Sequence, residues 1–319
     1  MFLCATCQSV FELPCCPHCG TPVERIDGIW QFTQDPDIVT DQEDDNYIGY
    51  EHIGAGYSGK DRYMITEKDR RIAQAVSRVL GDGVLLDLAC GDGRITVPVA
   101  ALGGRVIAAD ISRVMLRILL DKASRNSIDL GSVVIARMNA FALPIPDNTL
   151  DCIIANSFLH LVSHPEKVIR EIRRVLKPGG KFLCLLDAPG TKETEANRRY
   201  HEFENGIYGR YWELLMQQGI YPRKYSWAYD RDAICDPLFS VRETQTIPYS
   251  REVTYRLSDY FMPRMIARGF SDQSDVPGDI HQAAIQQVWA EFRDQYHEEL
   301  DTVTYHMREQ DLLLTIYSK

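Results

Sequence analysis

Residues 85–94 read Leu-Leu-Asp-Leu-Ala-Cys-Gly-Asp-Gly-Arg and carry the strongest structural signal of the chain. The first four form an apolar run that only Asp87 interrupts, which is typical of a buried parallel strand. Gly91 and Gly93 then make a turn without Cβ atoms, so a ligand can approach the backbone closely. The stretch predicts a strand, a glycine turn and a helix that together hold a cofactor.

Two features of this turn distinguish between the cofactors that it could bind. A dinucleotide fingerprint has a third glycine three residues after the second, where this chain has Thr96. Asp87 would repel a pyrophosphate but attracts the ammonium group of an amino acid. The residues therefore favour S-adenosylmethionine (SAM). Asp110, which ends the apolar run 105–110, suits the ribose hydroxyls of either cofactor.

The following segments alternate between strand and helix patterns. Apolar runs predict strands at 133–135, 150–156 and 181–187, and helical spacing predicts helices at 66–80 and 165–176. Such alternation is typical of a doubly wound α/β sheet. Two further segments, 239–248 and 312–318, are expected to pair as its antiparallel edge. The charged residues of the second helix are interpreted as a solvated face without a function: Glu166, Lys167, Arg170, Glu171, Arg173 and Arg174.

Four ordered motifs, LLDLACGDGR, VIAADIS, NAFALPIPDNTLDCIIANSFLHLV and EIRRVLKPGGKFL, resemble class I SAM-dependent methyltransferases over roughly residues 80–187. The resemblance implies a Rossmann-like, mostly parallel seven-stranded sheet with an antiparallel last strand and a helical cap. It also implies a set of cofactor residues: Asp87, Ala89, Gly91 and Gly93 at the methionine end, Asp110 and Ile111 at the ribose and adenine, Asn139, Ala140 and Phe141 at the adenine, and Asn156. Many relatives have Asp at position 139, where the amide keeps an acceptor but lacks the charge.

A second signal is a set of cysteines near the N-terminus. Two CxxC pairs, Cys4 with Cys7 and Cys16 with Cys19, are eight residues apart, and four thiolates suit a tetrahedral structural Zn²⁺ site. His18 is placed outside the ligand set. The ribbon also resembles that of zinc-ribbon rRNA guanine N1-methyltransferases, so recognition of RNA or of a partner is the alternative to a purely stabilising role.

Composition bears on partners and location. With 35 Lys plus Arg against 45 Asp plus Glu, the 319 residues carry a net charge of −10, whereas polynucleotide-binding proteins normally have a basic footprint. A small-molecule partner is therefore expected and a nucleic acid disfavoured. The absence of a membrane-length apolar run and of a signal peptide predicts a cytoplasmic enzyme. The oligomeric state stays open.

The predicted domains are a zinc ribbon at 1–34, a linker or lid at 35–65, and a methyltransferase domain at 66–319. Its substrate cap is expected at about 190–236 and 257–298. Three tyrosines of the lid could close the site or simply pack: Tyr47, Tyr50 and Tyr57. The aromatic and aliphatic residues of 208–216 could likewise pack or roof an apolar substrate pocket.

These features predict SAM-dependent methyl transfer to a small or medium-sized organic acceptor, with specialised metabolism as the favoured setting. The alternatives are an rRNA base methyltransferase and a catalytically silent SAM-fold subunit that supports a partner. His160, four residues after Asn156, is the candidate general base for an acceptor that carries a proton. A histidine that packs against or caps the next helix is the other interpretation.

Overall fold

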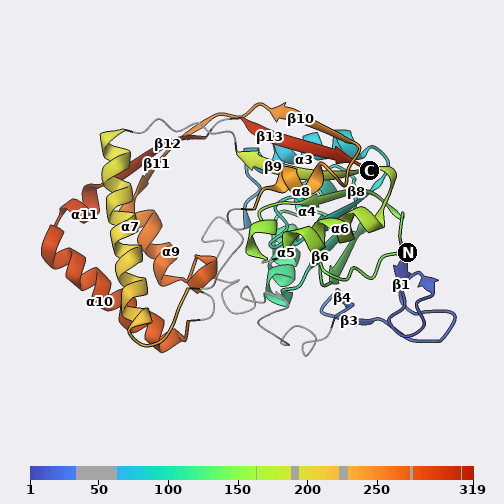
Figure 1. Ribbon diagram of the computed structural model, residues 1–319, viewed down its shortest axis with the longest axis horizontal. Coiled ribbons are helices and arrows are strands. Elements are labelled where there is room, and N and C mark those ends of the chain that lie inside the picture. Colours follow the sequence, from blue (N-terminus) through green and yellow to red (C-terminus); the bar gives the residue numbers. More distant parts are fainter. Residues whose placement is uncertain (34–62, 163, 188–193, 223–228, 274–275, 310) are drawn as a thin grey trace.

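A nine-stranded sheet forms one end of the protein, and a mainly helical lobe forms the other (Figure 1). The computed structural model describes residues 1–33, 63–162, 164–187, 194–222, 229–273, 276–309 and 311–319. The sheet has the order β10-β13-β9-β8-β5-β6-β7-β4-β3. In that order the strands are Val241–Ile247, Leu312–Ser318, Leu176–Asp187, Leu150–Ala155, Val84–Leu88, Arg105–Asp110, Val133–Arg137, Ile29–Gln31 and Glu24–Ile26.

The centre of this sheet is the predicted doubly wound arrangement. Strands β5 to β9 pair in parallel, and β13 pairs antiparallel with both β9 and β10. These seven strands confirm the predicted fold class and its antiparallel edge. The N-terminal hairpin β3–β4 adds two strands, because β4 pairs in parallel with β7. Each hairpin strand has only three residues, which is too short for a periodicity to be visible.

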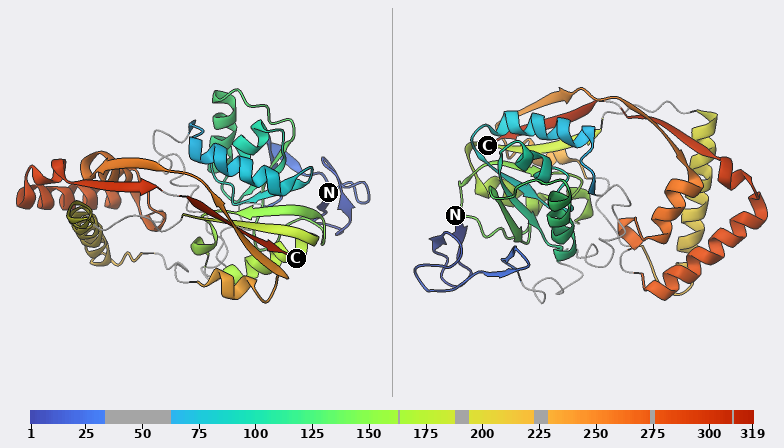
Figure 2. Two further views of the ribbon diagram at one scale, coloured as in Figure 1. Left: turned by 90° about the horizontal axis from the view of Figure 1, so that it is seen from above. Right: turned by 180° about the vertical axis from the view of Figure 1, so that it is seen from behind.

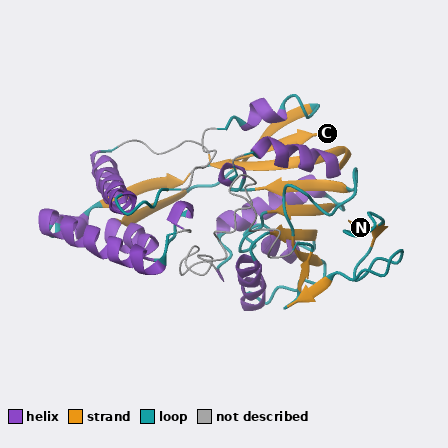
Figure 3. Cartoon of the chain, turned by 60° about the horizontal axis from the view of Figure 1, so that its bottom comes forward, coloured by secondary structure: helices purple, strands orange, loops and turns teal. Residues whose placement is uncertain are grey.

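Helices cover both faces of the sheet (Figure 3). Alternation along β5 divides the core: Leu85 packs with α3 (Glu67–Leu80), whereas Leu86 and Leu88 pack with α6 (Pro165–Val175). Two more helices, α4 (Thr96–Ala101) and α5 (Arg113–Arg125), follow β5 and β6 on the α3 side. Apolar cores on both faces explain why the central strands are almost continuously hydrophobic.

The N-terminal ribbon packs against the sheet domain (Figure 2). Its first strands, β1 (Phe2–Leu3) and β2 (Val10–Phe11), pair antiparallel. Phe2, Phe11, Cys4 and Cys16 are buried in the same apolar cluster as residues of α6. The ribbon is thus continuous with the core of the sheet domain.

The helical lobe is built from two segments of the chain, one between β9 and β10 and one between β10 and β13, and has its own apolar core. Its elements are α7 (Glu195–Met216), η3 (Leu257–Phe261), α9 (Met262–Ile266), η4 (Ser271–Gln273), α10 (Gly278–Tyr296) and α11 (Glu299–Thr302). The antiparallel pair β11 (Arg251–Arg256) and β12 (Thr304–Glu309) joins the lobe to the sheet as an extension of β10 and β13 (Figure 2). No helix in the described ranges combines the length and the apolar character needed to cross a bilayer.

The aromatic and aliphatic group of 208–216 belongs mainly to the core of this lobe. Tyr211, Trp212, Leu214 and Leu215 are buried there, while Met216 is exposed. Packing, rather than roofing a pocket, is therefore the interpretation that the structure supports for these four residues.

Two expectations about the cap and the lid meet different outcomes. Helix α8 (Arg231–Cys235) lies within the range predicted for the cap and packs with the sheet core near α6. Cys235 and Phe239 are buried in that core. The tyrosines predicted for the lid, at 47, 50 and 57, lie outside the described residues.

Candidate active site

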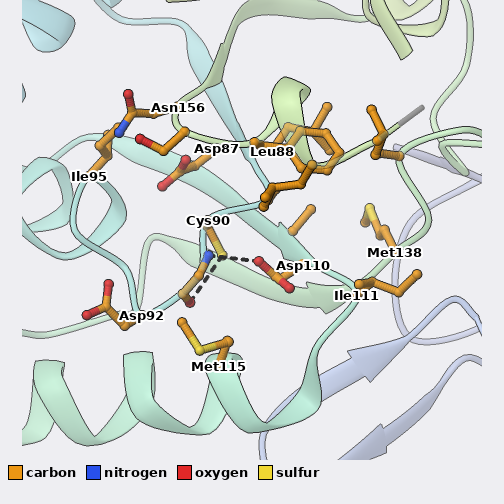
Figure 4. Close-up of a pocket in the computed structure, with 18 of the residues that line it drawn as sticks. Asp87, Leu88, Cys90, Asp92, Ile95, Asp110, Ile111, Met115, Met138 and Asn156 are labelled. Atoms are coloured by element: carbon orange, nitrogen blue, oxygen red, sulfur yellow. Dashed lines mark hydrogen bonds between the residues drawn. The ribbon is translucent and has the colours of Figure 1, made fainter. Parts of the chain in front are cut away.

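A cavity of about 180 Å³ opens at the carboxyl ends of β5, β6, β7 and β8 (Figure 4). Ligands of doubly wound sheets bind at this edge. All predicted cofactor residues except Gly93 line it: Asp87, Ala89, Gly91, Asp110, Ile111, Asn139, Ala140, Phe141 and Asn156. Residues spread over 70 positions of the sequence thus meet around one space.

Asp87 is the buried carboxylate of this site, with only 2% of its surface exposed. Its Oδ2 accepts hydrogen bonds from the backbone N–H of Thr96 at 3.0 Å and from the Thr96 hydroxyl at 2.6 Å. Burial raises the pKa of Asp87 to about 7, although the bonds from Thr96 lower it. A cationic ligand group beside this carboxyl would favour its ionised form. In the sequence, Thr96 indicates only that the turn lacks the third glycine of a dinucleotide fingerprint. No sequence signal indicates its hydrogen bonds to Asp87.

Asp110 connects the ends of β5 and β6. Its Oδ2 accepts from the Gly91 N–H and its Oδ1 from the Ser112 N–H, both at 2.8 Å. Asp87 and Asp110 lie on either side of the turn at Cys90 (Figure 4). The Asp110 carboxylate therefore fixes the glycine turn and also forms part of the cavity wall.

Gly93, predicted at the methionine end of the cofactor, packs against α5 in the structure. It does not line the cavity, and a Cβ at this position would lie 2.6 Å from Cγ of Leu119 on α5. Its φ of +78° is also one that residues with side chains rarely adopt. The missing Cβ thus permits close helix packing, which is the role that a third glycine has in dinucleotide-binding folds.

The segment after β7 forms the wall expected to hold adenine, with Met138, Asn139, Ala140 and Phe141 at the cavity. The Asn139 side-chain oxygen accepts from the Phe141 N–H at 2.9 Å, so this amide also shapes the turn.

Two residues of α6 hold the continuation of this segment, which corrects the interpretation of the α6 charges as a solvated face without a function. Glu171 accepts from the Leu143 N–H at 2.7 Å. Arg174 donates to the carbonyl oxygens of Leu143 and Ile145 at 2.9 and 2.8 Å. The sequence could not show this, because the partners are about 30 residues apart.

Other features of the site also lacked a sequence signal. Asp92 lines the cavity, and its carboxylate pairs with the buried Lys122 Nζ of α5 at 3.0 Å. Ala89 and Ser157 adopt left-handed φ angles of +56° and +53°, and both line the cavity. Non-glycine residues adopt this conformation uncommonly, and the surrounding structure must hold any strain that it causes.

His160 lies beside the cavity but does not line it. It belongs to η2 (Leu159–Leu161), from which Leu161 and the preceding Phe158 reach the cavity wall. Burial lowers the pKa of His160 and so favours the neutral imidazole. Its role as a general base stays a prediction.

The four predicted metal ligands come together at the N-terminus. The sulfur atoms of Cys4, Cys7, Cys16 and Cys19 all lie within 4.8 Å of one another, and the pairs Cys4–Cys19 and Cys7–Cys16 are 3.5 and 3.6 Å apart. Four sulfurs bound tetrahedrally to zinc lie about 3.8 Å apart, so the cluster fits this ion.

The pKa values of Cys4, Cys7 and Cys19 lie below the usual range of a thiol, whereas burial and the side-chain bonds to Cys7 and Cys19 raise the pKa of Cys16 to about 11. A bond from the Cys7 backbone N–H lowers the pKa of Cys4, and one from the Thr21 hydroxyl lowers the pKa of Cys19. His18 is not part of this cluster.

Comparison with known proteins identifies the class of the sheet domain. Residues 86–184 match the family described as "Methyltransferase domain". This match begins next to Asp87 and includes the glycine turn, Asp110 and the adenine wall. Residues 86–184 of the sheet domain are thus similar to a methyltransferase domain.

Individual relatives match the same part of the chain. Ubiquinone/menaquinone biosynthesis C-methyltransferase UbiE of Cronobacter sakazakii is 40% identical over 134 residues, which are 41% of this chain and 53% of that protein. The enzyme of the same name from Pasteurella multocida is 45% identical over 104 residues, which are 32% and 38% of the two chains. The chain therefore spans about half or less of the curated relatives that it matches.

Among solved structures, the YcgJ protein of Bacillus subtilis is similar at a TM-score of 0.44 with 16% identity. The similarity covers 80% of this chain and 99% of that protein. At this TM-score it adds nothing to the sequence match.

Proposed function

We propose that the protein transfers the methyl group of SAM to a small or medium-sized organic acceptor. The observation that carries the proposal is the cavity in which Asp87 and Asp110 flank one glycine turn. A buried carboxylate suits the ammonium group of SAM, and a second one, on the next strand, suits its ribose. The UbiE relatives, named as C-methyltransferases of ubiquinone and menaquinone biosynthesis, support an acceptor of small-molecule size.

The residues of the site would bind and orient the reactants. When bound, SAM supplies a methyl group on a positively charged sulfur. Asp87 would hold the ammonium group, Asp110 the ribose hydroxyls, and the segment 139–141 the adenine. Methyl transfer requires an acceptor atom in line with the sulfur, and alignment of the two reactants supplies much of the rate. The neutral His160 is the proposed base for an acceptor that must lose a proton.

The lobe and the cysteine cluster have separate proposed roles. The lobe, inserted before the last strand of the sheet, would select the acceptor. Cys4, Cys7, Cys16 and Cys19 would hold one structural Zn²⁺, since four thiolates leave no open position for water. Near-stoichiometric zinc in protein purified without chelator is the expected result, and its absence would remove the metal assignment. A cytoplasmic location stays a prediction.

Calorimetric titration tests the cofactor. We expect SAM and S-adenosylhomocysteine to bind at one site per chain and NAD not to bind. Binding of NAD instead of SAM would overturn the proposed function.

Transfer of label from methyl-tritiated SAM then tests the acceptor class. Phenols and quinols are suitable probes because the relatives' name refers to quinones. Label in a small molecule would support the proposal. Label in ribosomal RNA would favour the alternative that the acidic composition argues against.

A further inference from the structure

The adenine wall and its continuation, residues 138–145, are bound by two other parts of the chain. Glu171 and Arg174 of α6 bind the backbone at Leu143 and Ile145. The N-terminal ribbon also binds it directly, because the Leu3 N–H donates to the Pro144 carbonyl oxygen at 2.9 Å.

The ribbon and the strand that follows it add further contacts to this support. The Phe32 N–H, just after β4, donates to the Arg137 carbonyl oxygen at 3.0 Å, immediately before the wall begins. The rings of Phe2 and Phe32 have centroids 4.7 Å apart. Phe2, which is 4% exposed, is buried in the same apolar cluster as Met138 and Leu143.

The metal ligands belong to this same packed region. Cys4 follows Leu3 directly and is buried with Cys16 in the cluster that contains Phe2. Strands β1 and β2 have two residues each, which is too few for a hairpin to be stable alone. Binding of a metal to four cysteines supplies folding free energy to a segment of this size. Without the metal, Phe2 and Leu3 would lose the fixed position from which they support the wall.

We propose that the ribbon is a positioning element of the cofactor site, in which the metal-bound cluster holds Phe2 and Leu3 against residues 138–145 and thereby sets the affinity for SAM. The inference rests on the proposed binding of SAM and zinc. Phe2 and Leu3 act through the adenine wall and touch no reacting atom.

The first test removes the metal from the full-length protein with a chelator and then restores it with zinc. Calorimetry should show SAM binding roughly tenfold more weakly after removal and fully restored afterwards. Hydrogen exchange, measured without SAM, should become faster at residues 138–145 after removal, while the amides of α3 stay protected. Unchanged SAM affinity and unchanged exchange after verified metal loss would overturn the proposal.

This design separates the inference from the proposed function. Exchange at 138–145 needs no cofactor, so metal-dependent protection of these amides would be detected even if SAM did not bind. Failure of the metal-loaded protein to bind SAM would count against the proposed function. Metal-independent exchange would count against the positioning role alone.

A variant provides a second route that keeps all four cysteines. Phe2→Ala should retain zinc, bind SAM several-fold more weakly and exchange faster at 138–145. Val10→Ala is the matched control, because Val10 lies on the paired strand β2 with 48% of its surface exposed. Equal SAM affinities for the two zinc-loaded variants would contradict the assignment of Phe2 as a positioning residue.

Discussion

The sheet domain and the helical lobe both bury polar side chains, but they use them differently. In the sheet domain, Asp87 and Asp110 bond backbone groups of the glycine turn and its helix while also facing a cavity. In the lobe, the Tyr211 hydroxyl and Nδ1 of His281 lie 2.8 Å apart, and Tyr208 donates to Asp272. Buried polar groups that also line a cavity indicate a ligand site, whereas groups that satisfy one another indicate a specified core.

The lobe histidine shows the distinction most clearly. His281 is fully buried, and its second ring nitrogen, Nε2, lies 3.3 Å from the Ile266 carbonyl oxygen. Both ring nitrogens therefore have partners inside the lobe. Burial lowers the pKa of His281, as it does for His160, so a lowered pKa alone does not distinguish a functional histidine from a structural one.

The largest effect should come from removing both carboxylates of the cofactor site. Asp87→Ala combined with Asp110→Ala should abolish measurable SAM binding, a loss of more than about 4 kcal/mol, because charge-assisted contacts at both ends of the cofactor disappear. Calorimetry measures the affinity, and circular dichroism confirms folding. Asp121→Ala, on the exposed face of α5, is the control. Undiminished SAM affinity in a folded double variant would break the contrast between the two regions.

A substitution in the lobe core should lower the stability of the lobe and leave the SAM affinity unchanged. Leu215 is fully buried in the lobe, and Leu215→Ala should cost about 4 kcal/mol of lobe stability through the cavity that it leaves. Proteolysis and hydrogen exchange of α7 and α10 report this loss, while the SAM affinity should stay unchanged. Met216→Ala is the control because its side chain is exposed. A parallel fall in SAM affinity would show that the lobe and the cofactor site are coupled.

The same contrast explains what the sequence could predict. Strands β5 to β9 and the residues at their ends were identifiable, because a buried strand and the turn after it are encoded within about ten neighbouring positions. A glycine can be required for close approach of a ligand or for close packing of a helix, and the sequence does not distinguish the two. At Gly93, only the position of Leu119 shows the packing role. Two hydrogen bonds, Leu3 to Pro144 and Lys122 to Asp92, join segments that are far apart in the sequence, so no local pattern predicts them. The sequence of the lobe indicates apolar residues, but it does not show that they form a core separate from the cofactor pocket.

The next largest effect concerns the pH dependence of stability, which should depend on Asp87 in the sheet domain. The pKa of Asp87 is about 7 in the folded protein, above the value near 3.9 of an unfolded Asp. The protonated form of this carboxyl therefore stabilises the folded, SAM-free protein. This contribution is lost as the pH rises from 4 through 7. Asp87→Asn should therefore stabilise the SAM-free protein at pH 8 by about 3 kcal/mol relative to wild type, with little gain at pH 4. The amide oxygen can still accept from Thr96.

Urea unfolding at the two pH values measures this difference. In the wild type, SAM affinity should rise with pH up to about 7, since the ionised carboxyl binds the ammonium group. Equal free energies of unfolding for wild type and Asp87→Asn at pH 8 would show that burial does not raise the pKa of this carboxyl.

The smallest expected effect concerns His160, at the border of the cavity. His160→Gln should lower kcat about tenfold for an acceptor that carries a proton, since a base contributes to the rate but positioning remains. Because burial lowers the pKa of His160, the wild-type kcat should fall only at acidic pH, below that lowered value, and the variant should lose this dependence. His164→Gln is the matched control, because the side chain of this histidine is 44% exposed and pairs with Glu166 at 3.1 Å. If both variants behave alike, or if His160→Gln changes only the SAM affinity, His160 belongs with His281 as a packing residue, and the functional part of the sheet domain ends at the cavity wall.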